Sequence, residues 1–224
     1  MITRIIFAGA MLVLSAFTMS GPASSADFWA GVQTGYRGGA GGELDAGVSN
    51  FAQGFPLALR FAVGYSIREA GKAADARRIF INDATDGTPE KNGSFLDFRF
   101  DLMYPLQWPA AKRISVTGGV RYARSKSHFK YVGGNEDFNV TGKEWGLGAG
   151  LEGSFPITGR IDLTVGGGVD YFFKAALTGH DTSYSPDGDD VNPRDYTYDD
   201  ADAAINQPSL IGRALIGLSY KLGR

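Results

Sequence analysis

The chain has no cysteine among its 224 residues, and after residue 26 it has no apolar stretch long enough for a transmembrane helix. Without cysteine, neither a disulfide nor a lipid anchor on an N-terminal cysteine is available to this protein. Acidic and basic residues are nearly balanced, at 24 against 22, so no cationic surface points to nucleic acid as a partner. Only two histidines are present, which leaves little imidazole for catalysis.

The first 26 residues have the pattern of a secretory signal peptide. Arg4 is the only charge before the apolar segment 5–17, and small residues fill positions 21–26. A retained transmembrane helix would need about 20 apolar residues, more than this segment supplies. We therefore expect cleavage of residues 1–26 and a mature barrel domain over residues 27–224.

Residues 160–177 alternate between apolar and polar side chains more clearly than any other stretch. The odd positions include Ile161, Leu163, Val165, Val169 and Tyr171, whereas the even positions include Arg160, Asp162, Asp170 and Lys174. Side chains of a β-strand point to opposite faces with a period of two. The stretch also exceeds the 9–11 residues that a tilted strand needs to cross a membrane.

The same alternation recurs along the chain and, together with the lengths of the connections, predicts eight strands. Six further strands are expected at residues 27–37, 57–68, 95–108, 113–124, 144–155 and 210–222. The connections 105–112 and 156–159 are short, whereas 69–94, 125–143 and 178–209 are long. Short and long connections alternate in outer-membrane barrels, which requires one more strand near residues 44–55. Its poor alternation suggests a bulge.

These strands predict an all-β fold, an eight-stranded antiparallel up-and-down transmembrane β-barrel with long extracellular loops and short periplasmic turns. Aromatic side chains occur near both ends of the apolar faces, as in the two interfacial girdles of a bilayer. The expected girdle residues are Tyr65, Trp145 and Tyr171 toward one rim, and Tyr104, Phe155 and Tyr220 toward the other. A soluble lipocalin-like barrel is the alternative, with its apolar faces turned inward.

With its signal peptide, strand alternation and loop asymmetry, the chain resembles the small bacterial outer-membrane barrels of the OmpA transmembrane-domain and OmpX class. The resemblance implies an outer-membrane location, contact with outer-membrane lipid and lipopolysaccharide, and insertion by the barrel-assembly machinery. In that class the final strand usually ends in an aromatic residue. Here Tyr220 is followed by Lys221, Leu222, Gly223 and Arg224, so the chain departs from that assembly signal.

The polar faces of the strands predict a charged lumen. Its expected members are Arg60, Asp97, Arg99, Asp101, Arg121, Glu152, Asp170, Lys174 and Arg213. An eight-stranded barrel is just filled by its own side chains, and buried charges must pair. We expect an ion-pair plug, with a gated ion path as the alternative.

The long loops carry the remaining polar chemistry. Residues 125–143 predict a hairpin that turns at 133–135 and presents Lys126, His128 and Lys130 either to lipopolysaccharide or only to solvent. Residues 178–209 are rich in aspartate but lack the spacing of an EF-hand, so a mobile loop without bound Ca²⁺ is expected. Residues 70–78 predict a short helix, followed by an apolar segment at 79–81 that could cover the rim or touch a partner.

We expect a structural or surface-interaction role carried by the loops, through which an extracellular ligand could bind, and no enzymatic activity, cofactor or metal. A narrow pore is the second hypothesis, and a lipid A-modifying enzyme is the third. The third would need His128 or His180, but His180 and Asp181 are expected to point to opposite sides of a strand. The segment 148–153 matches the glycine pattern of dinucleotide sites, yet it continues a strand rather than opening a helix. Its small residues are expected to leave room for large neighbours in a narrow lumen.

Overall fold

The computed structural model describes residues 26–82, 86–106 and 113–222 of the chain. The expected signal peptide falls almost entirely in residues 1–25, outside the described residues, so its cleavage stays a prediction. Trp108, the expected end of one strand, also lies outside the described residues, as do Gly223 and Arg224. None of the helices in the described ranges is both long and apolar enough to cross a membrane.

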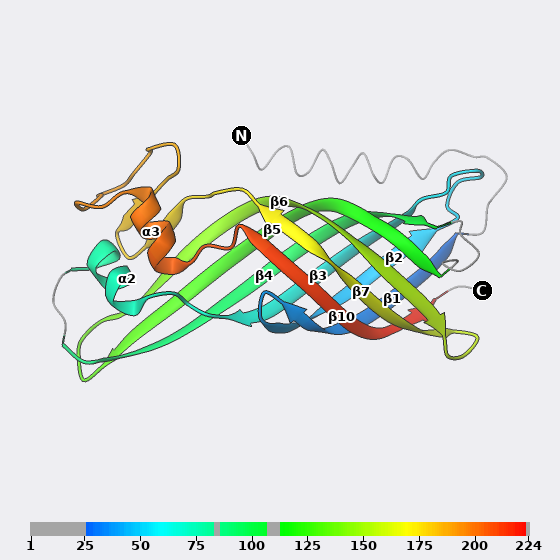
Figure 1. Cartoon of the computed structure of the whole chain (residues 1–224), viewed down its shortest axis with the longest axis horizontal. Coiled ribbons are helices and arrows are strands. Elements are labelled where there is room, and N and C mark those ends of the chain that lie inside the picture. Colours follow the sequence, from blue (N-terminus) through cyan, green and yellow to red (C-terminus); the bar gives the residue numbers. More distant parts are fainter. Residues whose placement is uncertain (1–25, 83–85, 107–112, 223–224) are drawn as a thin grey trace.

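Eight strands pair antiparallel in chain order and close into a barrel, as the alternation predicts (Figure 1). They are β1 (Asp27–Arg37), β2 (Ala40–Ser49), β3 (Ala58–Arg68), β4 (Thr88–Pro105), β5 (Ile114–Val132), β6 (Asp137–Pro156), β7 (Ile161–Phe172) and β10 (Leu210–Lys221). The pairing of β1 with β10 closes the barrel, from Trp29 opposite Lys221 to Arg37 opposite Arg213. Every strand therefore has two hydrogen-bonded neighbours.

The side chains of all eight strands alternate between the lumen and the outer surface. On β7, Asp162, Thr164 and Asp170 are buried, whereas Val165 and Val169 are exposed. Exposed large apolar side chains occur on every strand of the barrel. The apolar faces thus point outward, which rules out the lipocalin-like alternative. β7 itself ends at Phe172 rather than at residue 177.

The second strand lies four residues earlier than predicted. β2 begins at Ala40, directly after a two-residue turn whose Gly38 has φ +70°. Its pairing with β1 runs without interruption from Tyr36 opposite Ala40 to Asp27 opposite Ser49, so the expected bulge is wrong. The alternation is weak because Gly41, Gly42 and Gly47 carry no side chain to reveal it.

Three strands are much longer than the alternation alone predicts. β4, β5 and β6 have 18, 19 and 20 residues and extend beyond the rest of the barrel (Figure 1). The predicted hairpin over residues 125–143 is confirmed, because β5 and β6 stay paired as far as Lys130 opposite Asp137. The barrel wall is therefore tall on this side and low at the β1–β2 turn.

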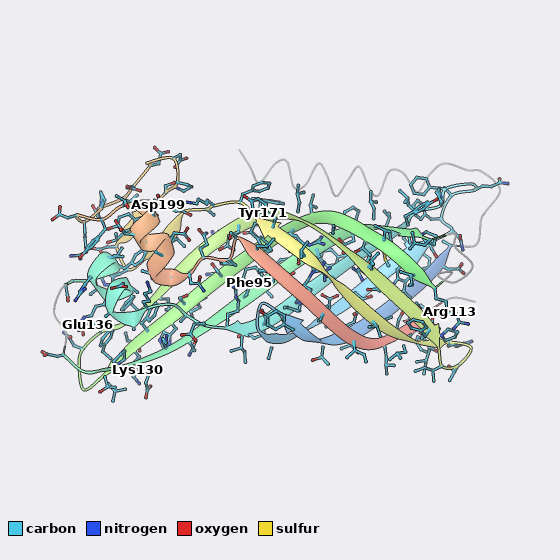
Figure 2. All side chains as sticks on the ribbon, viewed as in Figure 1. Phe95, Arg113, Lys130, Glu136, Tyr171 and Asp199 are labelled. Atoms are coloured by element: carbon cyan, nitrogen blue, oxygen red, sulfur yellow. The ribbon has the colours of Figure 1, made fainter. Side chains whose placement is uncertain are left out.

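The two ends of the barrel differ sharply. At the end where β1 begins and β10 ends, which we name the terminal end, the connections are residues 50–57, 106–113 and 157–160. The opposite end carries residues 69–82, 86–87 and 173–209 together with the β5–β6 hairpin, and we name this assembly the cap. Figure 2 shows the separation, with Arg113 at the terminal end and Lys130 and Glu136 at the cap.

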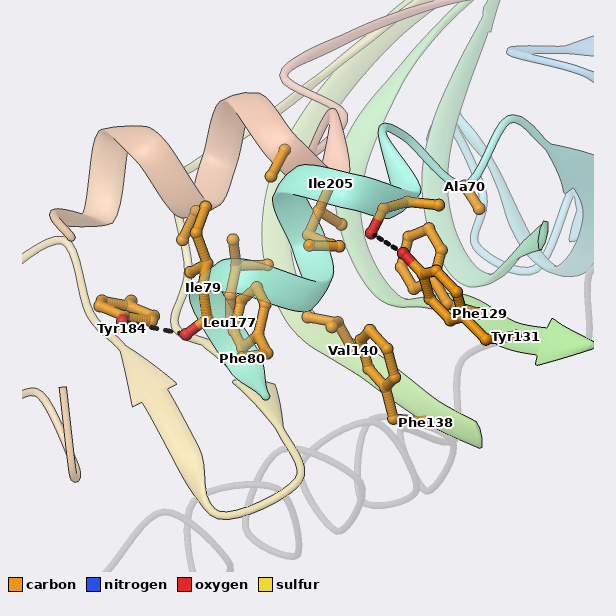
Figure 3. Close-up of a cluster of buried hydrophobic side chains, with 14 residues drawn as sticks. Ala70, Ile79, Phe80, Phe129, Tyr131, Phe138, Val140, Leu177, Tyr184 and Ile205 are labelled. Carbon is orange, nitrogen blue, oxygen red and sulfur yellow. Dashed lines mark hydrogen bonds between the residues drawn. The ribbon is translucent and has the colours of Figure 1, made fainter. Parts of the chain in front are cut away.

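The cap is a folded unit with its own apolar core. It contains α2 (Ala73–Phe80), α3 (Tyr198–Ile205) and the small strands β8 (Leu177–Gly179) and β9 (Thr182–Tyr184). Its core packs Phe80, Phe129, Phe138, Leu177 and Tyr184 between the helices and the β5–β6 hairpin (Figure 3). The predicted helix at 70–78 is thus present with shifted ends.

Two buried hydroxyls fasten α2 to the rest of the cap. Tyr131 donates a hydrogen bond to the carbonyl of Ala73 at 2.8 Å, and Tyr184 donates one to the carbonyl of Ile79 at 3.2 Å (Figure 3). The apolar segment 79–81 therefore covers the interior of the cap. The expected mobile loop at 178–209 is wrong, because β8 continues the sheet from β6 and α3 packs against α2.

Candidate functional site: the barrel lumen

A continuous network of ion pairs fills the middle of the lumen. Arg37 donates two hydrogen bonds to Asp97, at 2.5 and 2.7 Å, and its guanidinium lies 3.5 Å from Glu43. Glu43 also pairs with Arg99, which lies 3.4 Å from Asp101. All of these side chains are at most 3% exposed, so water screens none of the pairs.

Asp101 joins the two halves of the network. Its carboxylate lies 2.9 Å from Arg60 and 2.7 Å from Arg121. On one side Arg60 continues to Glu152, which accepts a hydrogen bond from Gln33 at 3.2 Å. On the other side Arg121 contacts Asp170 at 2.7 Å, and Asp170 contacts Arg213 at 2.5 Å.

The charges of this network cancel. Its cations are Arg37, Arg60, Arg99, Arg121 and Arg213, and its anions are Glu43, Asp97, Asp101, Glu152 and Asp170. Five positive charges thus meet five negative charges. This balance is what burial demands, because one uncompensated ion in a dry interior costs several kcal/mol.

The structure brings together eight of the nine residues predicted for the lumen, and Lys174 is the exception. Because β7 ends at Phe172, the alternation no longer applies at Lys174, and its side chain is 57% exposed. Its ammonium contacts Asp199 of the cap at 2.9 Å, and this hydrogen bond raises the pKa of Lys174. Lys174 therefore ties the barrel rim to α3.

Two charged members of the network, Arg37 and Glu43, are absent from the predicted set. Arg37 stands at the end of a correctly predicted strand, but the sequence shows no partner for it. Glu43 lies before the predicted start of the second strand, at residue 44, so the alternation assigns it to neither face. The signal that could locate both is the Gly38-Gly39 pair, since paired glycines between strands predict a tight hairpin turn.

An apolar layer lies in the lumen between the network and the cap. Phe95, Ala123, Phe172 and Ile211 form a buried cluster, and each lies two residues from a network residue on its own strand. The rings of Phe95 and Phe172 meet edge to face with centroids 5.3 Å apart. The Arg68 guanidinium, at the end of β3, lies 5.3 Å from the centroid of the Phe95 ring.

The terminal end of the lumen is hollow. A cavity of about 510 Å³ lies there, and its wall includes Trp29, Asp45, Met103, Glu152 and Asp162. Glu152 belongs to both the cavity and the ion-pair network, so the cavity ends where the network begins. The cavity thus extends from the terminal end of the lumen as far as the network.

Glycines on the inner faces make room for the arginines. A Cβ atom on Gly64 would overlap the Arg37 guanidinium, and one on Gly148 would overlap Arg121 and Asp170. The prediction that small residues accommodate large neighbours in a narrow lumen is therefore confirmed at Gly148. The whole segment 148–153 lies within β6 and opens no helix, as the alternation predicts.

The six aromatic residues predicted for the interfaces all lie on the outer surface, between 41% and 53% exposed. Tyr104, Phe155 and Tyr220 stand close to the strand ends at the terminal end of the barrel. Tyr65 and Tyr171 stand near the opposite ends of β3 and β7, and Trp145 lies on the level of the end of β7. Their arrangement is two separated groups, as a girdle at each interface would require.

Neither histidine lies in the lumen. The His128 ring is hydrogen-bonded to Asp137 at 2.7 Å on the outside of the β5–β6 hairpin. The His180 ring is hydrogen-bonded to Asp181 at 3.1 Å, so the expectation that these two point apart is wrong. His180 has φ +41° at the β8–β9 turn, where strand alternation no longer holds. Within the described ranges, no hydroxyl group is hydrogen-bonded to either ring.

Several aspartates of residues 178–209 accept hydrogen bonds within this segment. The Asp190 carboxylate accepts a hydrogen bond from the Ser185 backbone N–H at 2.7 Å, and Asp200 caps α3. In the described part of the chain, no group of three or more His, Cys, Asp or Glu side chains is arranged to hold a metal ion. Burial raises the pKa of Asp202, which faces Lys174 at 3.9 Å.

No protein-family model matches the chain, and no curated protein matches it. Among solved structures, a major outer membrane protein from Thermus thermophilus aligns over 88% of this chain and 100% of its own, with 22% identity and a TM-score of 0.72. Ail, the attachment invasion locus protein of Yersinia pestis, aligns over 89% of this chain and 99% of its own, at 10% identity and a TM-score of 0.45. Neisserial surface protein A aligns over 90% of this chain and 100% of its own, at 14% identity and a TM-score of 0.40. The chain therefore has the fold of a small eight-stranded outer-membrane β-barrel.

Proposed function

We propose that this protein is a closed, non-conducting barrel of the bacterial outer membrane, whose folded cap is its interaction surface outside the cell. The outward apolar side chains of every strand support insertion into lipid. A closed barrel leaves no unpaired strand edge, which lipid would not tolerate. A lumen this polar within an exterior this apolar is typical of a barrel surrounded by hydrocarbon.

The asymmetry of the two ends supports an orientation. Outer-membrane barrels have short turns toward the periplasm and long loops outside the cell. The terminal end carries three short connections, so we assign it to the periplasm, and we assign the cap to the cell surface. This orientation agrees with export by a signal peptide and insertion by the barrel-assembly machinery, both of which remain proposals for this chain.

The observation that carries the proposal of a closed barrel is the buried ion-pair network. Every charged member has a partner of opposite sign, and the bridging residues Asp101, Arg99 and Arg121 have fully buried side chains. An ion entering this layer would have to break existing pairs in a dry interior. The apolar layer of Phe95 and Phe172 adds a second barrier without polar groups to replace hydration water.

Single-channel recording in planar bilayers tests the closure. We expect the purified full-length mature chain to give no steady conductance steps. A double variant, Arg99→Ala with Arg121→Ala, removes two fully buried guanidinium groups and should produce measurable steps if it inserts. Folding of both proteins is checked by the shift in electrophoretic mobility on heating. Steady steps from the wild-type chain would overturn the proposal.

A narrow channel is the second candidate, because the cavity at the terminal end already opens the lumen from one side. In that case the wild-type conductance would depend on the network residues, and Glu152→Gln would change its ion selectivity. A lipid A-modifying activity is a third candidate. It would be indicated by turnover of lipid A that His128→Ala or His180→Ala abolishes.

A further inference from the structure

On the outer face of β4, β5 and β6, side chains of cross-strand partners form rows across the three strands, and we call each row a tier. One tier is aromatic and consists of Phe98, Tyr122 and Trp145, which are direct cross-strand partners. The ring centroids of Phe98 and Tyr122 are 6.3 Å apart, and those of Tyr122 and Trp145 are 5.0 Å apart. Such a continuous aromatic row marks the level where hydrocarbon gives way to headgroups.

The next tier toward the cap carries two cations side by side. Arg124 stands between Leu96 of β4 and Lys143 of β6, and both cations are exposed on the outer face. One step further, Lys126 stands between Ser94 and Thr141. Like charges directly opposite each other in an antiparallel pair are unfavourable. An anion bound beside Arg124 and Lys143 would offset their repulsion.

The cross-strand neighbours of these cations supply no such anion. Within the described ranges, no carboxylate lies at ion-pair distance from Arg124, Lys126 or Lys143. Nearer the tip of the hairpin the situation is different, because Lys130 stands between Glu90 and Asp137. The cation at the tip thus has acidic cross-strand neighbours, whereas the cross-strand neighbours of Arg124 and Lys126 are not acidic.

The level of these cations indicates which kind of anion could bind beside them. Two residues along a strand correspond to about 7 Å, so the cations lie just beyond the aromatic row. A ligand there has acyl chains against Trp145 and Tyr122 and an anionic group against the cations. Arginine binds phosphate oxygens through its planar fork, and lysine adds point charges.

We infer that Arg124, Lys126 and Lys143 form a binding site for the phosphate groups of an outer-leaflet glycolipid of the lipid A class. The inference rests on the proposed orientation, which places the cap outside the cell. It differs from an interaction through Lys126, His128 and Lys130, because His128 pairs with Asp137 and the cross-strand neighbours of Lys130 are acidic.

Native mass spectrometry of the detergent-solubilised full-length mature chain measures this binding. The probes are bisphosphorylated lipid A, the same lipid with its phosphates removed, and inorganic phosphate alone. The double variant Arg124→Gln with Lys143→Gln should bind bisphosphorylated lipid A about thirtyfold more weakly, given the usual contribution of a cation at an anionic surface. The dephosphorylated lipid should bind weakly to both proteins, and inorganic phosphate should bind weakly because it lacks acyl chains.

Two matched control variants distinguish binding at this site from a general effect of positive surface charge. Lys130→Gln removes a cation that already has carboxylate neighbours, and Arg160→Gln removes an exposed cation at the terminal end. Both variants should bind lipid A as the wild type does. Equal affinity of the double variant and the wild type, or equal losses in the control variants, would overturn the inference.

Thermal unfolding is a second measurement, in which a purely structural role of Arg124 and Lys143 would give a different result. Without lipid, the double variant should be at least as stable as the wild type, because the repulsion between positions 124 and 143 is removed. With bisphosphorylated lipid A, the wild type should gain melting temperature and the double variant should not. Lower stability of the variant without lipid would contradict the inference. Conductance steps from the wild-type chain would overturn only the proposal of a closed barrel.

Discussion

At the scale of single residues, Asp101 has the most connected position in the lumen. Its carboxylate is completely buried and contacts Arg60 at 2.9 Å, Arg99 at 3.4 Å and Arg121 at 2.7 Å. A buried ion pair contributes little net stability compared with an apolar pair, but the loss of one partner leaves the other uncompensated. The structural consequence of this network is therefore specificity for one arrangement of strands.

We expect Asp101→Ala to lower the free energy of unfolding by about 3–5 kcal/mol, because three guanidinium groups then share the remaining carboxylates. Equilibrium unfolding in guanidinium chloride, with the protein in lipid bilayers, measures the change. Asp199→Ala serves as the control, since its pair with Lys174 is exposed, and it should leave barrel stability nearly unchanged. Equal effects of the two substitutions would contradict this account.

A glycine can matter as much as a charge in so narrow a lumen. Gly148→Ala adds a methyl group where Arg121 and Asp170 already lie, and we expect a loss of about 1–3 kcal/mol from displaced partners. Gly212→Ala is the matched control, because a Cβ at that outward position meets no atom within 4 Å. The two variants are compared by the same unfolding measurement, and a similar loss for both would show that steric room in the lumen is not the cause.

At the scale of elements, α3 illustrates how local chemistry orders a loop that looks unstructured from its composition. The Thr197 side chain accepts a hydrogen bond from the Asp200 backbone N–H, and the Asp200 carboxylate accepts one from the Thr197 backbone N–H at 2.9 Å. This reciprocal capping box starts the helix, and Asn206 ends it with φ +56°. The high density of aspartate therefore reflects helix capping and turn formation.

Acid should loosen α3 before it affects the barrel. The hydrogen bonds from Thr197 hold the pKa of Asp200 below its usual value, so this carboxylate stabilises the helix above the unfolded pKa of about 4. The contribution is lost as the pH falls through the lowered, folded pKa. The protection factors of residues 198–205 in amide hydrogen exchange should therefore fall below about pH 4. In Thr197→Ala they should already be lower than in the wild type at pH 7, from the loss of about 1 kcal/mol of capping, whereas unchanged protection would contradict the role of the box.

At the scale of the whole molecule, the barrel and the cap are held by different forces. The barrel is closed by backbone hydrogen bonds and braced by buried charges. The cap is held by an apolar core, in which Phe80 and Tyr184 pack edge to face with centroids 5.5 Å apart. Since the two parts share mainly the β5–β6 hairpin, they should respond separately to substitution.

We expect Phe80→Ala to unfold the cap selectively, because removal of a fully buried ring costs about 3–5 kcal/mol. Limited proteolysis should then cut within residues 69–87 and 173–209, while the strands of the barrel stay protected. Phe100→Ala is a suitable control, since this ring is exposed on the outer face of the barrel. A protease-resistant cap in Phe80→Ala would show that the apolar core does not hold it.

The alternation along the chain predicted the barrel, seven of its eight strands and most of the lumen, and the order of short and long connections predicted the eighth strand. A period of two in side-chain polarity is a local property, and the surrounding solvent selects which face points outward. Residues such as Arg60, Asp97 and Asp170 could be placed for that reason alone. Lys174 could not, because a local period does not reveal where a strand ends.

The pairing of the charges and the order of the cap depend instead on contacts between distant segments. Arg37 meets Asp97 across 60 residues of sequence, and Glu43 joins them only because the Gly38-Gly39 turn brings β2 back four residues earlier than expected. The cap likewise depends on contacts between residues as distant as Ile79 and Tyr184. Such contacts follow from closure of the sheet, which sets every register at once, and no single segment contains that information.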